Sequence, residues 1–188
     1  MRRHAAGVMV VMALALCAGS AQAQQAPAPA TAPAARPADV ASVDAIIAAL
    51  YDVISGPAGQ KRDWDRFHSL FVPGARLIPT GRAQDGTVRH RVMTPDEYVA
   101  TSGRMLEERG FFESEIGRTT EQFGNITHVF SAYDSRNRAE DPAPFARGIN
   151  SIQLLKDAQR WWIVSVFWDS ETPSNPIPSK YLNRGSDR

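Results

Sequence analysis

The sequence predicts an α+β domain in which short helices come first and a largely antiparallel sheet forms the C-terminal half. Apolar residues recur at helical spacing after residue 43, and strand-like alternation dominates beyond residue 110. Residues 148–169 resemble two long strands joined by a polar turn at 157–160, the pattern of a β-hairpin. The second arm, 161–168, is apolar at nearly every position, so we expect both of its faces to be covered. One cover can be the chain's own helices, and we expect the other to be a second copy.

Strict alternation divides this second arm into two faces. One face would carry Trp162, Val164, Val166 and Trp168, and the other would carry Trp161, Ile163, Ser165 and Phe167.

The N-terminal residues 1–23 are predicted to be a signal peptide. Arg2 and Arg3 precede an apolar run over 8–17, and residues 21–23 form a small-x-small cleavage site. The run is shorter than the ~20 residues that span a bilayer, so we expect a periplasmic or secreted protein without stable membrane insertion after signal removal. Lipidation of Cys17 is an alternative, which the large Leu16 before it disfavours. Residues 24–38 are rich in Pro and Ala and are predicted to be a disordered linker.

The composition restricts the class of partner. The 188 residues, 43% of them hydrophobic, suffice for one ordinary domain. Cys17, the only cysteine, leaves with the signal peptide, so the mature chain can form no disulfide. Loss of two arginines lowers the formal charge from +1 to −1, which argues against nucleic acid as a partner.

The domain is expected over residues 39–170, followed by a Pro-rich tail over 171–188. Local start and stop signals predict the elements of its first half. These are a helix capped by Asp39 or Ser42 and ended by Gly56-Pro57, a helix capped by Asp63 and broken at Pro73-Gly74, strands at 75–80 and 87–93, and a helix opened by the Thr94–Glu97 capping box and ended at Gly110.

Strands at 111–120 and 123–136 and the hairpin at 148–169 complete the prediction. The order is therefore helix, helix, hairpin, helix and four strands, which gives a mostly antiparallel sheet of about six strands.

Several stretches carry a resemblance to a known superfamily. They are Trp64–Phe67 with Leu70-Phe71, Gly124–Tyr133, Gly148–Leu154 and Arg160–Ile163. The chain resembles the nuclear transport factor 2-like (NTF2-like) superfamily, which includes SnoaL-like and ketosteroid isomerase-like proteins, over nearly all of 39–170. The resemblance implies three helices packed on a strongly curved sheet, a cone with an inner cavity, and a homodimer formed through the outer sheet face. Members include isomerases, dehydratases, cyclases and non-catalytic transport factors, so the fold does not determine the activity.

Two histidines are the candidates for acid/base chemistry. His128 and His90 each share a strand face with apolar neighbours, and they would enter the cavity if those faces lined it. A histidine there could act as a general acid or base, and we take His128 as the candidate catalytic residue. The alternative is that each is a structural residue hydrogen-bonded to a neighbour.

Four residues are candidates for ligand binding: His90, Tyr98, Asn150 and Trp168. The Asn150 amide, which lies among apolar neighbours, could bind a carbonyl or phenol oxygen. The Tyr98 hydroxyl could donate a hydrogen bond at the rim of the cavity, and Trp168 could form part of its wall. Each has a plain structural role as its alternative. Glu113 and Glu115 alternate on one face and are expected to be exposed. Three dispersed histidines predict no metal site, and no dinucleotide or phosphate-loop motif predicts a cofactor.

Three functions therefore remain open. The first is an exported protein that binds a small hydrophobic molecule in an apolar pocket. The second is a cofactor-independent isomerase, dehydratase or cyclase with His128 as the acid/base and Asn150 or Tyr98 orienting the substrate. The third is a dimeric scaffold whose cavity is filled by side chains. The sequence does not decide whether the protein is an enzyme.

Overall fold

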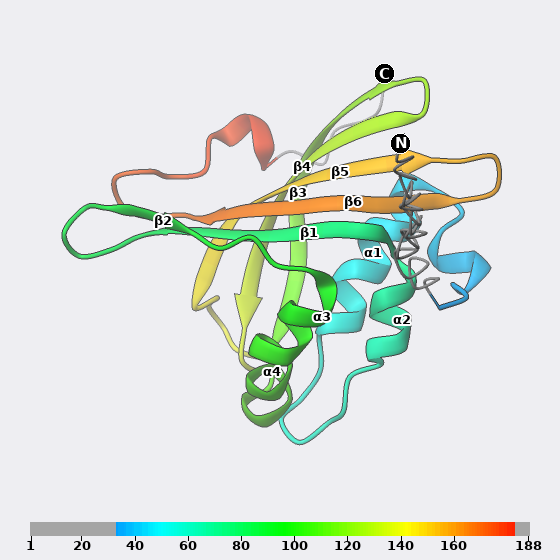
Figure 1. The fold of residues 1–188 in the computed structure, drawn as a ribbon. Helices are drawn as coiled ribbons and strands as arrows, with labels where there is room; N and C mark the ends of the chain where they lie inside the picture. The colour runs from blue at the N-terminus through cyan, green and yellow to red at the C-terminus, as the bar shows by residue number, and fades with distance from the viewer. Residues whose placement is uncertain (1–32, 183–188) are drawn as a thin grey trace, which may run out of the picture.

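The computed structural model describes residues 33–182, which form one six-stranded sheet with helices packed against it (Figure 1). The predicted signal peptide and the linker up to residue 32 lie outside the described residues, as does the tail beyond 182. The elements in chain order are η1 (Pro37–Asp39), α1 (Val43–Ile54), α2 (Trp64–Ser69), β1 (Phe71–Arg82), β2 (Val88–His90), α3 (Pro95–Tyr98), the π-helix η2 (Val99–Gly103), α4 (Arg104–Arg109), β3 (Phe112–Phe123), β4 (Ile126–Arg136), β5 (Ala146–Lys156), β6 (Trp161–Ser170) and η3 (Ser179–Tyr181).

The sheet has the strand order β2-β1-β6-β5-β4-β3. All neighbouring pairs are antiparallel except β1 and β6, which are parallel. The predicted α+β class and the six strands are therefore confirmed. The sheet remains open, with β2 and β3 as its two edges.

The helical segments follow the predicted order but not the predicted number. The first two carry the expected caps, because Ser42 Oγ accepts from the Ala45 amide at 3.0 Å and Asp63 accepts from the Arg66 amide at 2.9 Å. The third predicted helix opens with the expected capping box at Thr94 and then divides into α3, η2 and α4. The prediction of three uninterrupted helices is therefore not confirmed, because the third one is divided.

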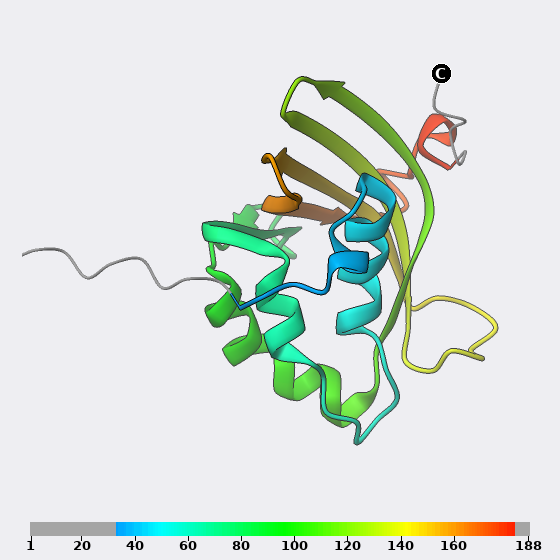
Figure 2. The same cartoon turned by 90° about the vertical axis from the view of Figure 1, so that its right-hand side faces the viewer.

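The sheet curves around the helices (Figure 2). Helix α1 lies on the concave face, whereas the C-terminal segment runs over the convex face. Fully buried side chains fill the space between α1, α2 and the concave face, among them Ile46, Phe67, Val129, Ile152 and Ile163. Burial of this apolar surface is the main source of stability for such a two-layer arrangement.

The strict alternation predicted for β6 is wrong. The pairing of β6 with β5 shifts between Ile163 and Ser165, which leaves Val164 as an extra residue. Because of this bulge, Trp161 and Ile163 pack into the core before it and Val166 packs into the core after it. Val164 is left exposed on the strand.

Strand β1 also departs from the prediction, because it begins at Phe71 and continues through Pro73 and Gly74. Its register with β6 shifts between Phe71 and Arg76. Gly74 has a φ of 85°, a conformation that glycine adopts without a steric penalty. The Pro-Gly pair thus makes an irregularity inside a strand instead of the end of a helix.

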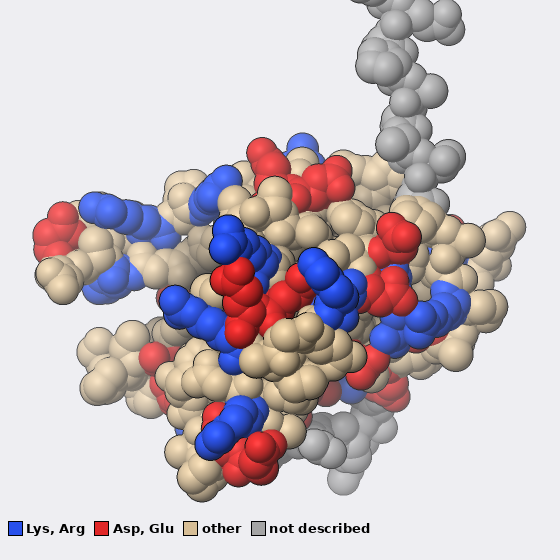
Figure 3. All heavy atoms as spheres, turned by 90° about the horizontal axis from the view of Figure 1, so that it is seen from below, with Lys and Arg blue, Asp and Glu red and all other residues tan. Residues whose placement is uncertain are grey.

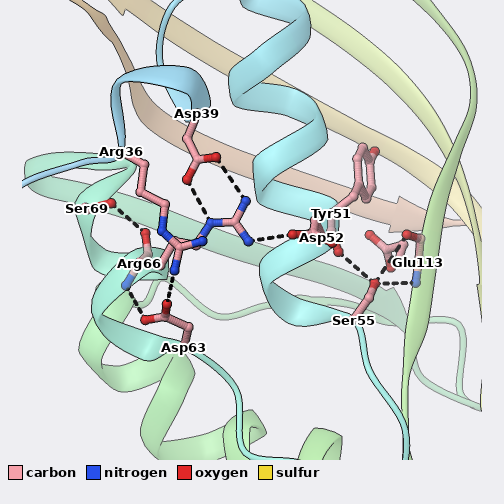
Figure 4. A network of polar contacts seen from close by, with 9 residues as sticks. All are labelled: Arg36, Asp39, Tyr51, Asp52, Ser55, Asp63, Arg66, Ser69 and Glu113. Carbon is pink, nitrogen blue, oxygen red and sulfur yellow. Dashed lines mark hydrogen bonds and ion pairs between the residues drawn. The ribbon is translucent and has the colours of Figure 1, made fainter.

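Both flanking segments contact the domain where they are described. In the predicted linker, Arg36 donates to Asp63 at 2.7 Å, and Arg66 then ties Asp39 to Asp52 (Figure 4). In the tail, the ring centroid of Tyr181 lies 4.9 Å from that of Phe130. Contacts with the domain are therefore made by residues on both sides of 39–170. Within residues 33–182, no helix is long and apolar enough to cross a membrane.

Candidate functional site

An inner cavity of about 190 Å³ lies between the helices and the concave face of the sheet. Its lining comes from every layer of the domain: Leu50, Ile54, Phe67, Leu77, Tyr98, Ser102, Met105, Leu106, Phe111, Glu113, Tyr133, Asn150, Val166 and Trp168. Most of these side chains are apolar or aromatic, with a carboxylate, an amide and two phenols among them. This composition is typical of sites for small, mostly apolar molecules.

Aromatic packing fixes one wall of the cavity. Tyr98 stacks on Phe67, with ring centroids 5.5 Å apart and planes at 22°, and it meets Trp168 edge-on at 6.4 Å. Burial and the nearby charge of Glu113 raise the pKa of the Tyr98 phenol, so the hydroxyl is neutral and can donate a hydrogen bond. The cavity therefore has a rigid aromatic side that carries one hydroxyl.

Glu113 brings the carboxylate into the cavity wall. Strand β3 places it opposite Ser135, whose Oγ donates to Glu113 Oε2 at 2.9 Å, while Asn150 Nδ2 donates to Oε1 at 3.3 Å. Burial raises the pKa of Glu113 to about 7, and the charge of Asp134 adds to the rise, against the opposing effect of the two hydrogen bonds. A carboxylate with such a pKa can take up and release protons near neutral pH.

Cross-strand register aligns Asn150 with its neighbours. Ser131 on β4, Asn150 on β5 and Trp168 on β6 are consecutive partners on the concave face. From α1, the hydroxyl of Tyr51 reaches this line, 2.7 Å from Ser131 Oγ and 3.1 Å from Asn150 Nδ2. Figure 4 shows Tyr51 directed from α1 toward the strand that carries Glu113. The Tyr51 hydroxyl thus links helix α1 to the polar side chains of the sheet at the cavity.

A second hollow, a groove of about 570 Å³, lies between α1 and β3. Arg118 spans it, bonded to Asp44 at 2.8 Å and to Glu115 at 3.0 Å. Glu113 lines both the groove and the cavity. The groove is larger, but the Arg118 that spans it is already paired with Asp44 and Glu115, so we take the inner cavity as the candidate site.

Three of the residues predicted from the sequence lie in the cavity wall. Tyr98, Asn150 and Trp168 all line it. The two histidines do not.

His128, the candidate acid/base, is not among the residues that line the cavity. It lies on the convex face of β4, where its Nε2 is 3.0 Å from Ser151 Oγ and its ring meets Phe130 edge-on. The concave face of the same strand carries Thr127, Val129 and Ser131 instead. The more apolar alternation of β4 therefore lies on its outer face. On the inner face, Ser131 is paired with Tyr51 and Glu115, partners that the sequence does not reveal.

His90 is not among the cavity-lining residues either. It stands on β2, a three-residue edge strand that pairs only with β1, and it is exposed. The neighbouring Val88 and Val92 are exposed as well, since no layer covers this end of the hairpin.

Sequence reasoning missed Glu113 and Tyr51. Glu113 was expected to be exposed because it alternates with Glu115, and only the strand register reveals that this face is the concave one. Tyr51 had a usable signal, since it follows Ile47 by four positions on the buried stripe of α1. Among residues 33–182, no three His, Cys, Asp or Glu side chains lie close enough together to hold a metal ion.

Comparison with known proteins places this architecture among solved folds. No protein-family model matches the chain, and no curated protein matches it in sequence. A protein of unknown function from Nostoc punctiforme, described as having a cystatin-like fold, has a TM-score of 0.51 at 14% identity over 72% of this chain and 92% of that one. A protein from Kribbella flavida has a TM-score of 0.51 at 9% identity over 70% and 90%.

An NTF2-like protein of unknown function from Silicibacter pomeroyi has a TM-score of 0.46 at 15% identity over 70% of this chain and 94% of that one. The two structures with a TM-score of 0.51 show that the chain shares their overall fold. At these identities the likeness concerns the fold alone.

Proposed function

We propose that the protein binds a small hydrophobic molecule that carries one hydrogen-bonding group. The observation that supports this most is the meeting of Glu113, Asn150 and Tyr98 in a cavity otherwise walled by apolar side chains such as Phe67 and Trp168. A few fixed polar groups in an apolar cavity orient a ligand, while the apolar wall supplies most of the binding free energy.

The ligand is small. Ligand pockets commonly have volumes of ~300–1,000 Å³, whereas the cavity is about 190 Å³. A single ring suits this space better than a fused ring system. The competing function, a scaffold whose cavity is filled by its own aromatic side chains, predicts that no molecule is retained.

A second candidate function is a cofactor-independent enzyme that moves a proton within its substrate. The observation that favours it is the raised pKa of Glu113, about 7, inside the cavity. Glu113 would take a proton from a carbon next to a carbonyl group and return it to another carbon of the same molecule, so that no atom is gained or lost. The Tyr98 hydroxyl would donate to the oxygen that becomes negative meanwhile. In this scheme Glu113 replaces His128 as the acid/base.

Native mass spectrometry of the purified protein tests the binding proposal. We expect a retained small molecule, which solvent extraction releases for identification. Ser102 lines the cavity, so Ser102→Leu should fill it and remove the molecule, while Ser114→Leu outside the cavity should keep it. Circular dichroism confirms that both variants fold. Absence of any retained or added ligand in the wild type would favour the filled scaffold.

The proposed place of action is outside the cytoplasm, because residues 1–23 resemble a signal peptide. We also propose a homodimer through the convex face, where Val164 and Phe167 are exposed on β6. Cell fractionation checks the first point. Sedimentation equilibrium at micromolar concentration checks the second, and a clean monomer would contradict it.

A further inference from the structure

Five hydrogen-bonding side chains form a continuous line from the groove to the cavity, which we name the polar row: Arg118, Glu115, Ser131, Tyr51 and Asn150. Arg118 Nε donates to Glu115 Oε2 at 3.1 Å, and Ser131 Oγ lies 2.6 Å from Glu115 Oε1. Tyr51 Oη is 2.7 Å from Ser131 Oγ, and Asn150 Nδ2 is 3.1 Å from Tyr51 Oη. The row thus connects an ion pair in the groove with an amide in the cavity wall.

The direction of every hydrogen bond in the polar row follows from its outer end. The Glu115 carboxylate is paired with the Arg118 guanidinium and can only accept hydrogen bonds. The single hydroxyl proton of Ser131 is therefore donated to Glu115. Ser131 can then only accept from Tyr51, which in turn has no proton left for Asn150. The group of Asn150 that faces Tyr51 must therefore be the donor, its amide nitrogen.

This assignment uses both amide protons of Asn150. One goes to Tyr51 at 3.1 Å and the other to Glu113 Oε1 at 3.3 Å. No donor of residues 33–182 is bonded to Asn150 Oδ1, and this oxygen is not among the fully enclosed atoms without a partner. Since Asn150 lines the cavity, its free carbonyl oxygen has the cavity beside it.

The cavity therefore presents acceptors on one side and a donor on the other. Asn150 Oδ1 and the Glu113 carboxylate accept, whereas the Tyr98 hydroxyl forms no hydrogen bond with a described residue and can donate. A hydroxyl group satisfies both sides, because it donates one hydrogen bond and accepts another. A ketone or an ether satisfies only Tyr98 and leaves Asn150 without a partner.

Building on the proposed binding function, we infer that the ligand is a small cyclic alcohol or phenol whose hydroxyl donates to Asn150 Oδ1. In this arrangement Glu115, Ser131 and Tyr51 are positioning residues, which act on the ligand through the orientation of the Asn150 amide. Selectivity in the cavity is thus set by an ion pair in the groove.

Calorimetry with two matched pairs of probes tests the ligand class: cyclohexanol against cyclohexanone, and phenol against anisole. The hydroxyl member of each pair should bind about tenfold more tightly, the size expected when a buried acceptor gains its partner. Equal affinities, or tighter binding of cyclohexanone, would overturn the inference while leaving the binding function intact.

A substitution in the groove tests the role of the polar row. In Glu115→Gln the new amide can donate to Ser131, which lets the bonds of the row reverse. Below pH 7, where Glu113 is protonated and can donate to Asn150 Oδ1, the Asn150 amide can then turn over. The preference should then shift toward cyclohexanone by about tenfold. Asp44→Asn is the control, because Asp44 bonds Arg118 at the outer end of the row and its loss leaves Glu115 and the bonds beyond it in place. An unchanged preference in Glu115→Gln would contradict the positioning role.

The amide orientation can also be checked without any ligand. In the free wild type, the Asn150 side-chain NH₂ protons should show nuclear Overhauser contacts to the Tyr51 ring protons. Their absence from an assigned spectrum would overturn the inference by itself. If the contacts are present and no probe binds at millimolar concentration, the proposed binding function fails and the ligand class fails with it.

Discussion

The two faces of β4 differ in what surrounds their side chains. On the concave face, Thr127, Ser131 and Ser135 are at most 2% exposed, although all three are polar. On the convex face, Ile126 is 63% exposed, although it is apolar. Ser131 and Ser135 are buried because they bond Tyr51, Glu115 and Glu113. These two hydroxyls are buried at little cost because they are paired, whereas the Thr127 hydroxyl is buried without a hydrogen-bond partner among residues 33–182.

The same substitution on the two faces should give the largest contrast. Ile152→Ala removes a side chain that is fully buried on the concave face and should lower the free energy of unfolding by about 2–5 kcal/mol. Ile126→Ala on the convex face should change it by less than ~0.5 kcal/mol. Urea denaturation of both variants measures the difference. Similar losses at the two positions would contradict the assignment of the faces.

The carboxylate on the concave face should make stability depend on pH. The pKa of Glu113 is raised from 4.5 to about 7, so the folded state holds this proton more tightly than the unfolded state does. The resulting stability is fully present below pH 4.5 and is lost as the pH rises to about 7, by at most ~3 kcal/mol. The wild type should therefore lose stability relative to Glu113→Gln across this range.

Glu97 supplies a comparison of opposite sign. The pKa of Glu97 is lowered, mainly by the hydrogen bond from the Thr94 amide. Its contribution to the stability of the folded state is therefore lost as the pH falls. Thermal unfolding of wild type, Glu113→Gln and Glu97→Gln between pH 3 and pH 8 separates the two effects. A wild type that tracks Glu113→Gln at every pH would show that the carboxylate is not desolvated.

Removing a tyrosine hydroxyl on the concave face should lower the free energy of unfolding more than removing one in the segment that covers the convex face. Tyr51→Phe leaves Asn150 and Ser131 without a common partner and should cost about 1–3 kcal/mol. Tyr181→Phe keeps the ring that packs on Phe130 and should stay within ~0.5 kcal/mol. Chemical denaturation is the measurement, and equal effects would show that the buried contacts of Tyr51 add nothing.

The smallest effect is expected at His128. Its half-buried ring bonds Ser151 outside the cavity, so His128→Gln should leave ligand binding within twofold of the wild type and stability within ~1 kcal/mol. Calorimetry with cyclohexanol provides the first value and urea denaturation the second. Loss of binding in this variant would return His128 to the candidate site.

The order of the elements was predictable because its signals are local. Ser42, Asp63 and the Thr94–Glu97 box each act within one helical turn, and the turn at Asp157 uses its own side chain to accept from the Arg160 amide. The sequence therefore carries these features directly.

The faces of the strands were not predictable in the same way. An extra residue at Val164 in β6, and another between Glu115 and Gly117 in β3, reverse the alternation partway along each strand. Bulges of this kind arise from contacts between strands, which a single strand's pattern does not contain. Glu113 lies before the bulge in β3, and only the pairing of β3 with β4 shows that its face is the concave one, so the sequence predicts it to be exposed.

The surface charge agrees with the composition. Basic and acidic side chains are interspersed over the face seen in Figure 3 and do not collect into one basic patch. This distribution gives a polyanion no continuous surface on that face.

The close approach of the tail to Gly117 has a consequence for assembly. A side chain at this position would meet the backbone of Tyr181 and Leu182, so the bare glycine lets the tail settle directly on β3. A second molecule approaching from that side would touch the tail before it touched the sheet. A pairing of copies through this face would then either use the neighbouring β5–β6 area or include the tail in the interface.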